Sequence, residues 1–259
     1  MKSFKIWFLY TKNSFQQTLF NRGVMIIMLF GKFLRIALFV IFLNFLFSGA
    51  KGLAGYSREQ IIFFYLSFNL IDTLAQMFFR EVYRFRDLVI SGNLDLVLTK
   101  PINPLLRTLL GGTDVLDFIM LFLILFATLW YGLNFITSSP LNWLLYIILI
   151  LNGLLIAAAF HIFVLGMGIL TTAVDHLIMI YRDFTSMLRI PVDLYIEPIR
   201  FILTFLIPLG IMITFPAKVL MGILSPAFMF ISISFAAVAF YLSLKFWRYS
   251  LKKYSSASS

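Results

Sequence analysis

The strongest constraint on this chain is a set of long, nearly uninterrupted apolar runs. Residues 24–47, 61–79, 115–136, 143–170 and 224–246 are runs of this kind, and about 20 helical residues suffice to cross a bilayer core of about 30 Å. The apolar residues are continuous and do not alternate, so they predict helices and argue against a transmembrane β-barrel. Because 61% of the residues are hydrophobic and only 12% are charged, an ordinary soluble domain is excluded. The sequence predicts an all-α polytopic membrane protein with a single domain over residues 1–259.

The N-terminal residues 1–22 do not form a span, because polar residues interrupt them. Their large apolar residues recur at spacings near three and four, which is typical of a helix with one apolar face: Phe4, Trp7, Phe8, Phe15 and Leu19. This pattern predicts a helix that lies in the membrane interface with its aromatic face toward the lipid.

The interval between the fourth and the last of these runs allows two interpretations. Hydropathy alone makes residues 201–215 part of the fifth span and leaves residues 173–200 in the cytoplasm. Alternatively, residues 172–191 cross the membrane despite their charges, which would then pair internally or line a path. Residues 197–220 would in that case form a re-entrant hairpin broken by prolines. Both interpretations give six crossings and place both chain ends on the same side.

The distribution of basic residues predicts the orientation. The N-terminal 22 residues, the interval 80–112 and the tail after residue 244 contain thirteen Lys and Arg, whereas the opposite side has only Lys51, Arg58 and Lys218. Cytoplasmic loops carry an excess of Lys and Arg, so we expect both termini and the interval 80–112 in the cytoplasm. The same rule accounts for the net charge of +10 without a nucleic-acid partner, and the chain is expected in the cytoplasmic (inner) membrane.

The motifs of common catalytic and cofactor sites are absent from the sequence. There is no Gly-x4-Gly-Lys-Ser/Thr phosphate loop, no His-Glu-x-x-His and no Gly-x-Ser-x-Gly. Cysteine is also absent, which excludes a thiolate metal site and a thiol nucleophile. We therefore predict no catalytic, cofactor-binding or metal-binding residue in this chain.

A few ionisable residues lie within the apolar segments, where they are costly and tend to be functional. We take five of them as a candidate translocation path: Lys32, Arg35, Asp72, His161 and Asp175. Simpler interpretations remain open, because Lys32 and Arg35 can extend toward the cytoplasmic interface and His161 can be a packed, hydrogen-bonded interior residue. Asp72 indicates either a helix–helix contact or a substrate path.

The cytoplasmic interval contains a short amphipathic pattern, a turn and a second apolar stretch that ends at prolines. Residues 89–101 read VISGNLDLVLTKP. They match the pattern Ile/Leu-x-x-Gly-x-Leu-Asp-x-x-Leu-x-Lys/Arg-Pro, with Val89 at the first position. Asn93 stands where the pattern often has Glu, and Lys100 replaces a frequent Arg, which keeps the charge but loses the bidentate fork. The residues alone are equally consistent with a helix that only closes a loop.

With three further matches, this motif resembles the ABC type-2 export permeases, particularly a branch long described only as a family of unknown function. The further matches are Gly55-Tyr56-Ser57, residues 191–195 with 207–222, and the tail 254–258. The resemblance as a whole covers almost the whole chain. The resemblance implies six spans, a cytoplasmic coupling helix between the second and third spans, and a re-entrant pair of short helices before the sixth. It therefore favours residues 172–191 as the fifth span and 197–220 as the hairpin.

The resemblance also implies a mechanism and partners. Two permease chains, identical or different, would pair, and each would bind a separate ATP-binding cassette subunit that holds ATP and Mg²⁺. Closure of the cassettes would push on a coupling region over residues 84–110, tilt the first two spans and open a path outward. The residues expected to couple are Arg84, Phe85, Arg86, Leu88, Val89, Gly92, Asp95 and Lys100.

The expected cargo is an amphipathic drug, a lipid or a lipid-linked glycan, because the path through such a chain is predominantly apolar. Two other functions remain as alternatives. An integral membrane enzyme that modifies lipids would need a clustered polar site, whereas the intramembrane carboxylates are scattered along the sequence. A non-transporting membrane scaffold could use the same fold.

Overall fold

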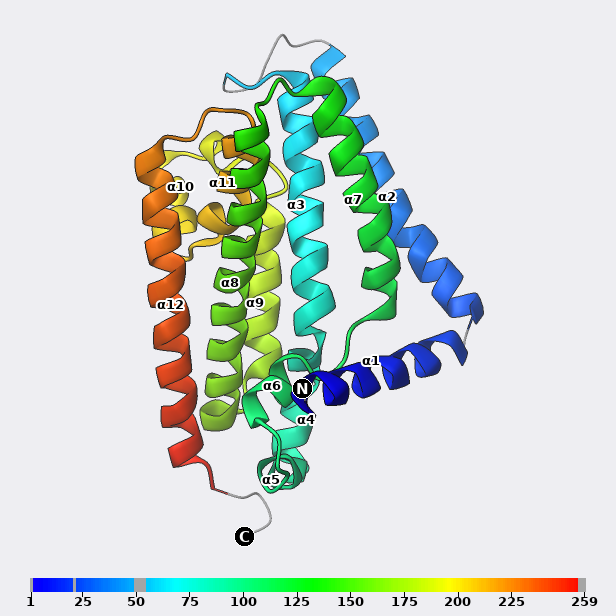
Figure 1. Cartoon of the computed structure of the whole chain (residues 1–259), viewed down its shortest axis with the longest axis vertical. Coiled ribbons are helices and arrows are strands. Elements are labelled where there is room, and N and C mark those ends of the chain that lie inside the picture. The colour runs from blue at the N-terminus through cyan, green and yellow to red at the C-terminus, as the bar shows by residue number, and fades with distance from the viewer. Residues whose placement is uncertain (1, 21, 49–54, 256–259) are drawn as a thin grey trace.

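A computed structural model of the chain describes residues 2–20, 22–48 and 55–255, and the elements in these ranges are all helical (Figure 1). This confirms the predicted all-α membrane architecture. The long helices are α1 (Lys2–Phe20), α2 (Arg22–Ser48), α3 (Arg58–Phe79), α7 (Val115–Phe135), α8 (Pro140–Thr171), α9 (Val174–Met187) and α12 (Pro226–Lys253). The short elements are η1 (Arg80–Arg84), α4 (Phe85–Ile90), α5 (Asn93–Leu98), α6 (Pro104–Leu109), η2 (Val192–Leu194), α10 (Glu197–Phe201), η3 (Ile202–Leu206) and α11 (Leu209–Leu220).

Five helices of the described chain are long and apolar enough to cross a membrane: α2, α3, α7, α8 and α12. A sixth span results if α10, η3 and α11 are counted together, although this segment is bent by 96°. Helix α9 has 14 residues, which corresponds to about 21 Å at 1.5 Å per residue. It is therefore shorter than a bilayer core of about 30 Å.

Helix α3 forms the centre of the bundle. It begins with a capping box, in which the Ser57 hydroxyl accepts from the Gln60 amide at 3.2 Å and the Gln60 side chain accepts from the Ser57 amide at 2.9 Å. Its residues from Ile61 to Ile71 are all buried, because the helix contacts α2, α7, α8 and α11. Every element that positions the site described below packs on or next to α3.

Close approach of helices depends on small residues and on interhelical hydrogen bonds, as is usual in membranes. A Cβ atom added at Gly153 of α8 would lie 2.6 Å from the carbonyl oxygen of Met212 in α11, so only glycine permits this contact. On the other side of α8, Asn152 donates to the Ser232 hydroxyl of α12 at 2.7 Å. These contacts join α8, α11 and α12 into one half of the bundle.

The bent segment lies at the end of the bundle opposite to the chain termini (Figure 1). The bend falls at Pro208, which cannot donate a backbone hydrogen bond. Asp193 fastens this segment to the start of α3, because it accepts from the Tyr56 hydroxyl at 2.7 Å and from Lys218 of α11 at 2.8 Å. Burial would raise the pKa of the Asp193 carboxyl, yet the bonds from Lys218 and Tyr56 hold it below its ordinary value.

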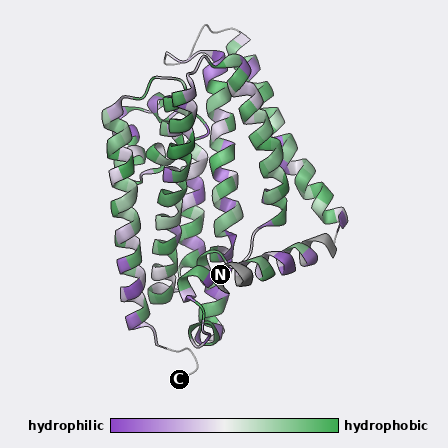
Figure 2. Cartoon of the chain, in the orientation of Figure 1, coloured by the Kyte–Doolittle hydropathy of each residue, from purple (hydrophilic) through white to green (hydrophobic). Residues whose placement is uncertain are grey.

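The opposite end of the bundle carries α1, α4, α5, α6 and the C-terminal end of α12. Figure 2 shows hydrophilic residues concentrated here, while the helix stretches between the two ends are mostly hydrophobic. Helix α1 crosses this end, and Phe15 packs edge-on against Phe118 of α7 with ring centroids 5.5 Å apart. The side chains of Phe4 and Leu19, which the interfacial-helix prediction uses, lie outside the described residues, so that prediction remains open.

Candidate functional site

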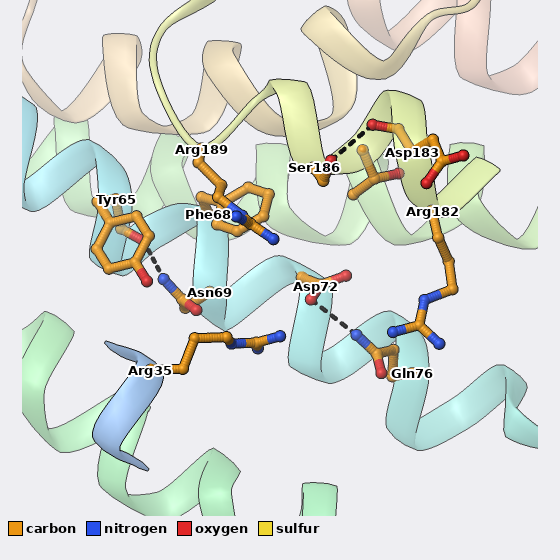
Figure 3. Close-up of a pocket in the computed structure, with 11 residues that line it drawn as sticks. Arg35, Tyr65, Phe68, Asn69, Asp72, Gln76, Arg182, Asp183, Ser186 and Arg189 are labelled. Atoms are coloured by element: carbon orange, nitrogen blue, oxygen red, sulfur yellow. Dashed lines mark hydrogen bonds between the residues drawn. The ribbon is translucent and has the colours of Figure 1, made fainter. Parts of the chain in front are cut away.

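A polar cavity of about 200 Å³ lies between α2, α3 and α9 (Figure 3). Helix α3 contributes one face of its surface, since the lining residues recur every three or four positions. The residues that line the cavity are Arg35, Tyr65, Phe68, Asn69, Asp72, Gln76, Arg182, Asp183, Thr185, Ser186 and Arg189. A polar cavity among apolar helices excludes a lipid-facing role for this surface.

Two hydrogen bonds fix the polar side chains of α3 to their own helix. Asn69 donates to the Tyr65 carbonyl at 2.7 Å, and Gln76 donates to the Asp72 carboxylate at 2.7 Å (Figure 3). Because Asp72 and Gln76 both belong to α3, the hydrogen bond between them does not join α3 to another helix. The sequence allowed Asp72 to be either a helix–helix contact or part of a substrate path. In the structure Asp72 lies on the cavity wall.

A second cavity of about 260 Å³ continues the first toward the end of the bundle that carries the termini. The two share Arg35, Asp72, Gln76 and Arg182, so together they form one polar groove. We refer to the combined lining of both cavities as the polar groove. It follows α3 and lies between α2, α7 and α9.

Ion pairs close the lower part of the polar groove. Lys32 of α2 pairs with Asp117 of α7, and Arg80 of η1 lies 3.4 Å from Asp114. Asp114 also caps α7, because its carboxylate accepts from the Leu116 amide at 2.8 Å. Both carboxylates at the start of α7 thus hold neighbouring helices together.

The five predicted path residues separate into two groups. Lys32, Arg35 and Asp72 all line the polar groove. His161 does not, because it is only 2% exposed in α8, where its Nδ1 lies 2.8 Å from the Ala157 carbonyl oxygen and its ring packs against Tyr181. His161 therefore does not line the polar groove, and its surroundings fit the alternative interpretation as a packed interior residue.

Asp175 also lies outside the polar groove. It starts α9 and pairs with Arg86 of α4 at 3.3 Å, so it connects the predicted coupling region to α9. Sequence reasoning did not select Arg182 and Arg189 individually, although it allowed the charges of this segment to line a path. Arg182 lies in α9 and Arg189 in the turn after its last residue, Met187. Their spacing of seven residues, about two helical turns, was the available signal.

The coupling region differs from the sequence-based expectation in the direction of its apolar face. Phe85 is 0% exposed and Val89 is 6% exposed, and the Phe85 ring packs near Trp247 of α12 with centroids 6.2 Å apart. Periodicity predicts an apolar face but not what covers it, and here α8 and α12 cover it. Phe85 and Val89 consequently belong to the core and do not offer a contact surface to a partner.

Other residues of this region do face outward. Ile90 and Leu96 are exposed, and Arg84, Arg86 and Lys100 are exposed beside them. A shallow groove of about 190 Å³ runs along this surface, lined by Tyr10, Leu88, Asn93, Leu96, Val97, Lys100, Ile102 and Arg107. We call it the cytoplasmic-end groove.

A buried ion pair attaches the coupling region to the bundle. Arg107 of α6 donates to Glu81 of η1 at 2.6 Å, and its guanidinium lies 4.2 Å from the centre of the Tyr10 ring of α1. Burial would lower the pKa of Arg107, but the Glu81 carboxylate raises it above its ordinary value. Three elements that are distant in the sequence therefore meet at this guanidinium.

The turn between α4 and α5 requires glycine. Gly92 has φ of +71°, which is the left-handed region that other residues rarely adopt. Asp95, in the first turn of α5, lies beside the hydroxyl of Tyr254, whose pKa is raised by burial and by this carboxylate. The sequence motif thus places α5 against the end of α12.

Comparison with known protein families identifies the chain. Residues 26–258 match the family described as ABC-2 family transporter protein. The chain belongs to this family. As an ABC-2 protein it is a multi-pass membrane component of a transporter, in a family that works with an ATP-binding cassette subunit. Neither a curated protein nor a solved structure gives a significant match.

The part of the chain that the structure describes contains no group of three or more His, Asp or Glu side chains that could hold a metal ion. Three carboxylates of the polar groove, those of Asp117, Asp114 and Asp72, instead contact Lys32, Arg80 and Gln76 respectively. The chemistry that the site offers is therefore binding of charged or polar groups.

Proposed function

We propose that this chain is the permease subunit of an ABC exporter of the cytoplasmic (inner) membrane. The observation that carries the proposal is the polar groove, which follows α3 through an otherwise apolar bundle. Ionisable side chains within a membrane are costly unless they face water, protein or substrate. A wall that combines Lys32, Arg35, Asp72 and Arg182 therefore suits a translocation path.

The orientation follows from the basic residues. Both termini and α4–α6 lie at one end of the bundle (Figure 1), the end with the larger excess of Lys and Arg. By the positive-inside rule this end is cytoplasmic. Transport away from it is export.

We assign α9 together with the residues up to 191 as the fifth span and residues 197–220 as a re-entrant hairpin. Helix α9 lies alongside α8 (Figure 1) and contacts it, whereas the segment 197–220 bends by 96°. Arg182 and Asp183 of α9 then face the polar groove and its opening. Since these side chains are exposed in the single chain, a second permease chain, identical or different, would complete the path there.

Force reaches the path through short rigid connections. Helix α3 continues into η1 and α4 without an intervening loop, and Arg86 pairs with Asp175 at the start of α9. A cassette subunit that binds ATP and Mg²⁺ and presses on the cytoplasmic-end groove would thus move α3 and α9 together. These two helices carry most of the lining of the cavity of about 200 Å³.

The experiment measures assembly with the cassette subunit. Leu96 is 59% exposed and lines the cytoplasmic-end groove, so Leu96→Asp should disrupt docking without disturbing the core. Burying a leucine contributes about 1.5–3 kcal/mol, so we expect assembly to weaken by about tenfold or more. The full chain is purified from its native membrane, and the co-purifying ATPase subunit and its ATP turnover are quantified.

Tyr249→Asp provides a matched control. Tyr249 of α12 is exposed at the same end of the bundle as Leu96 but lies outside the cytoplasmic-end groove. Leu88→Asp, at the half-buried wall of the groove, should act like Leu96→Asp. Normal assembly and ATP turnover in both leucine variants would mean that α4 and α5 only close a loop, and the proposed coupling would be refuted.

A further inference from the structure

We propose that the cavity between α2, α3 and α9 binds the phosphate group of an anionic amphiphile. This inference rests on the proposed function, because it names the class of substrate that the polar groove would carry. It concerns the upper part of the groove, where Arg35, Arg182 and Arg189 converge.

The cavity has more positive than negative charge in contact with it. Three guanidinium groups line it against two carboxylates, those of Asp72 and Asp183. No carboxylate of the described residues forms an ion pair within 4.0 Å with Arg35, Arg182 or Arg189. Arg84, Arg86, Arg107 and Arg200 by contrast each have such a partner. Among the described arginines outside the cavity, Arg22 and Arg248 also lack such a partner, so what distinguishes Arg35, Arg182 and Arg189 is that three unpaired guanidinium groups line one cavity.

The three side chains approach the cavity from two sides. Figure 3 shows Arg35 extending from α2, Arg182 from α9 and Arg189 from the turn after α9, into the space next to Asp72. A guanidinium presents donors in a planar fork that fits two oxygens of a phosphate at once. Several such forks on opposite sides suit a group with oxygens on several sides, which a phosphate has and a carboxylate lacks. A cationic ligand would meet net repulsion.

The size and surroundings of the cavity indicate that the phosphate belongs to an amphiphile. A volume of about 200 Å³ holds a headgroup but not an alkyl chain. The same two helices expose apolar side chains beside the arginines, namely Leu34 and Leu38 on α2 and Met179 on α9. An alkyl chain could lie along these surfaces while its phosphate remains in the cavity.

Binding of dodecyl phosphate to the purified full chain in discs of neutral lipid tests the proposal. We expect saturable binding, and we expect inorganic phosphate and dodecyltrimethylammonium to bind at least about tenfold more weakly, a difference of about 1.4 kcal/mol. Equal affinity for inorganic phosphate would show that the cavity binds a free anion only. Equal affinity for the cationic detergent would show that the arginines do not select charge. Either result would overturn the proposal.

Variants assign the binding to the cavity. Arg182→Gln with Arg189→Gln should weaken binding of dodecyl phosphate by about tenfold or more, because hydrogen bonds to charged groups are lost. The matched lysine pair should lie between this variant and the unchanged chain. Arg58→Gln, which removes an exposed arginine at the outer end, is the control and should bind normally. Unaltered binding in the glutamine pair would refute the site.

These arginines form no ion pair, so the variants are expected to fold, and their thermal unfolding checks this directly. Binding is measured without the cassette subunit, which separates the two hypotheses. If Leu96→Asp abolishes assembly while no anionic amphiphile binds, the permease assignment survives and this inference fails. If dodecyl phosphate binds but no cassette subunit couples to the chain, the proposed function fails instead.

Discussion

Replacing Arg107 by methionine should destabilise the chain strongly and specifically. The guanidinium is 17% exposed and its partner Glu81 is 8% exposed, so the variant leaves a buried carboxylate with only the largely exposed Arg84, 3.6 Å away, as its counter-ion. Breaking a buried pair in this way costs about 3–5 kcal/mol. We expect about 3 kcal/mol, the lower end, because the pair lies at the end of the bundle and not in its centre.

The assay is unfolding of the purified chain in mixed micelles by a denaturing detergent, followed by circular dichroism. Glu81→Met combined with Arg107→Met should recover most of the loss, since no buried charge remains. Arg58→Met, which removes an exposed pair with Glu59, is the control and should cost no more than about 1 kcal/mol. Additive losses in the double variant, or a loss near 1 kcal/mol for Arg107→Met alone, would refute the reasoning.

Two further predictions follow from the geometry. Gly92→Val should lower the free energy of unfolding by about 1–2 kcal/mol through backbone strain alone, because no atom lies within 4 Å of an added Cβ. Gly92→Asn should cost less. Unfolding by a denaturing detergent compares the two variants. The lowered pKa of Asp193 implies a stabilisation that is present above its unfolded pKa of about 3.9 and lost as the pH falls through the folded value. Asp193→Asn should therefore remove the contribution of this carboxyl and reduce the pH dependence of stability below about pH 4, measured by thermal unfolding.

The long helices could be predicted because length and hydropathy are strong local signals. Residues 24–47 and 143–170 lie within α2 and α8, and the polar residues that flank such runs mark their ends. Boundaries at polar positions were less accurate, since α8 begins at Pro140 and α12 continues to Lys253. Hydropathy does not register a helix that continues beyond the apolar core of the membrane.

The candidate site could be predicted only in part, because it depends on contacts between segments far apart in the chain. Lys32 and Asp117 are separated by 85 positions, and no local pattern relates them. Periodicity located an apolar face at Phe85 and Val89 but could not show that α8 and α12 cover it. Likewise, the charges of α9 lower its hydropathy, and only the assembled bundle shows that Arg182 and Arg189 line one cavity with Arg35.

Helix α2 is attached to the rest of the bundle more loosely than the other spans, and this has a mechanical consequence. Among its described residues only Leu43 and Phe47 are buried. Figure 1 shows α2 diverging from α3 toward its own N-terminal end, which follows α1. The tilt of such a helix responds to the thickness of the surrounding bilayer, at a cost of fractions of a kcal/mol per Å of mismatch. A thicker membrane would draw α2 upright and move Arg35 relative to α9, so lipid chain length itself would tune the width of the polar groove.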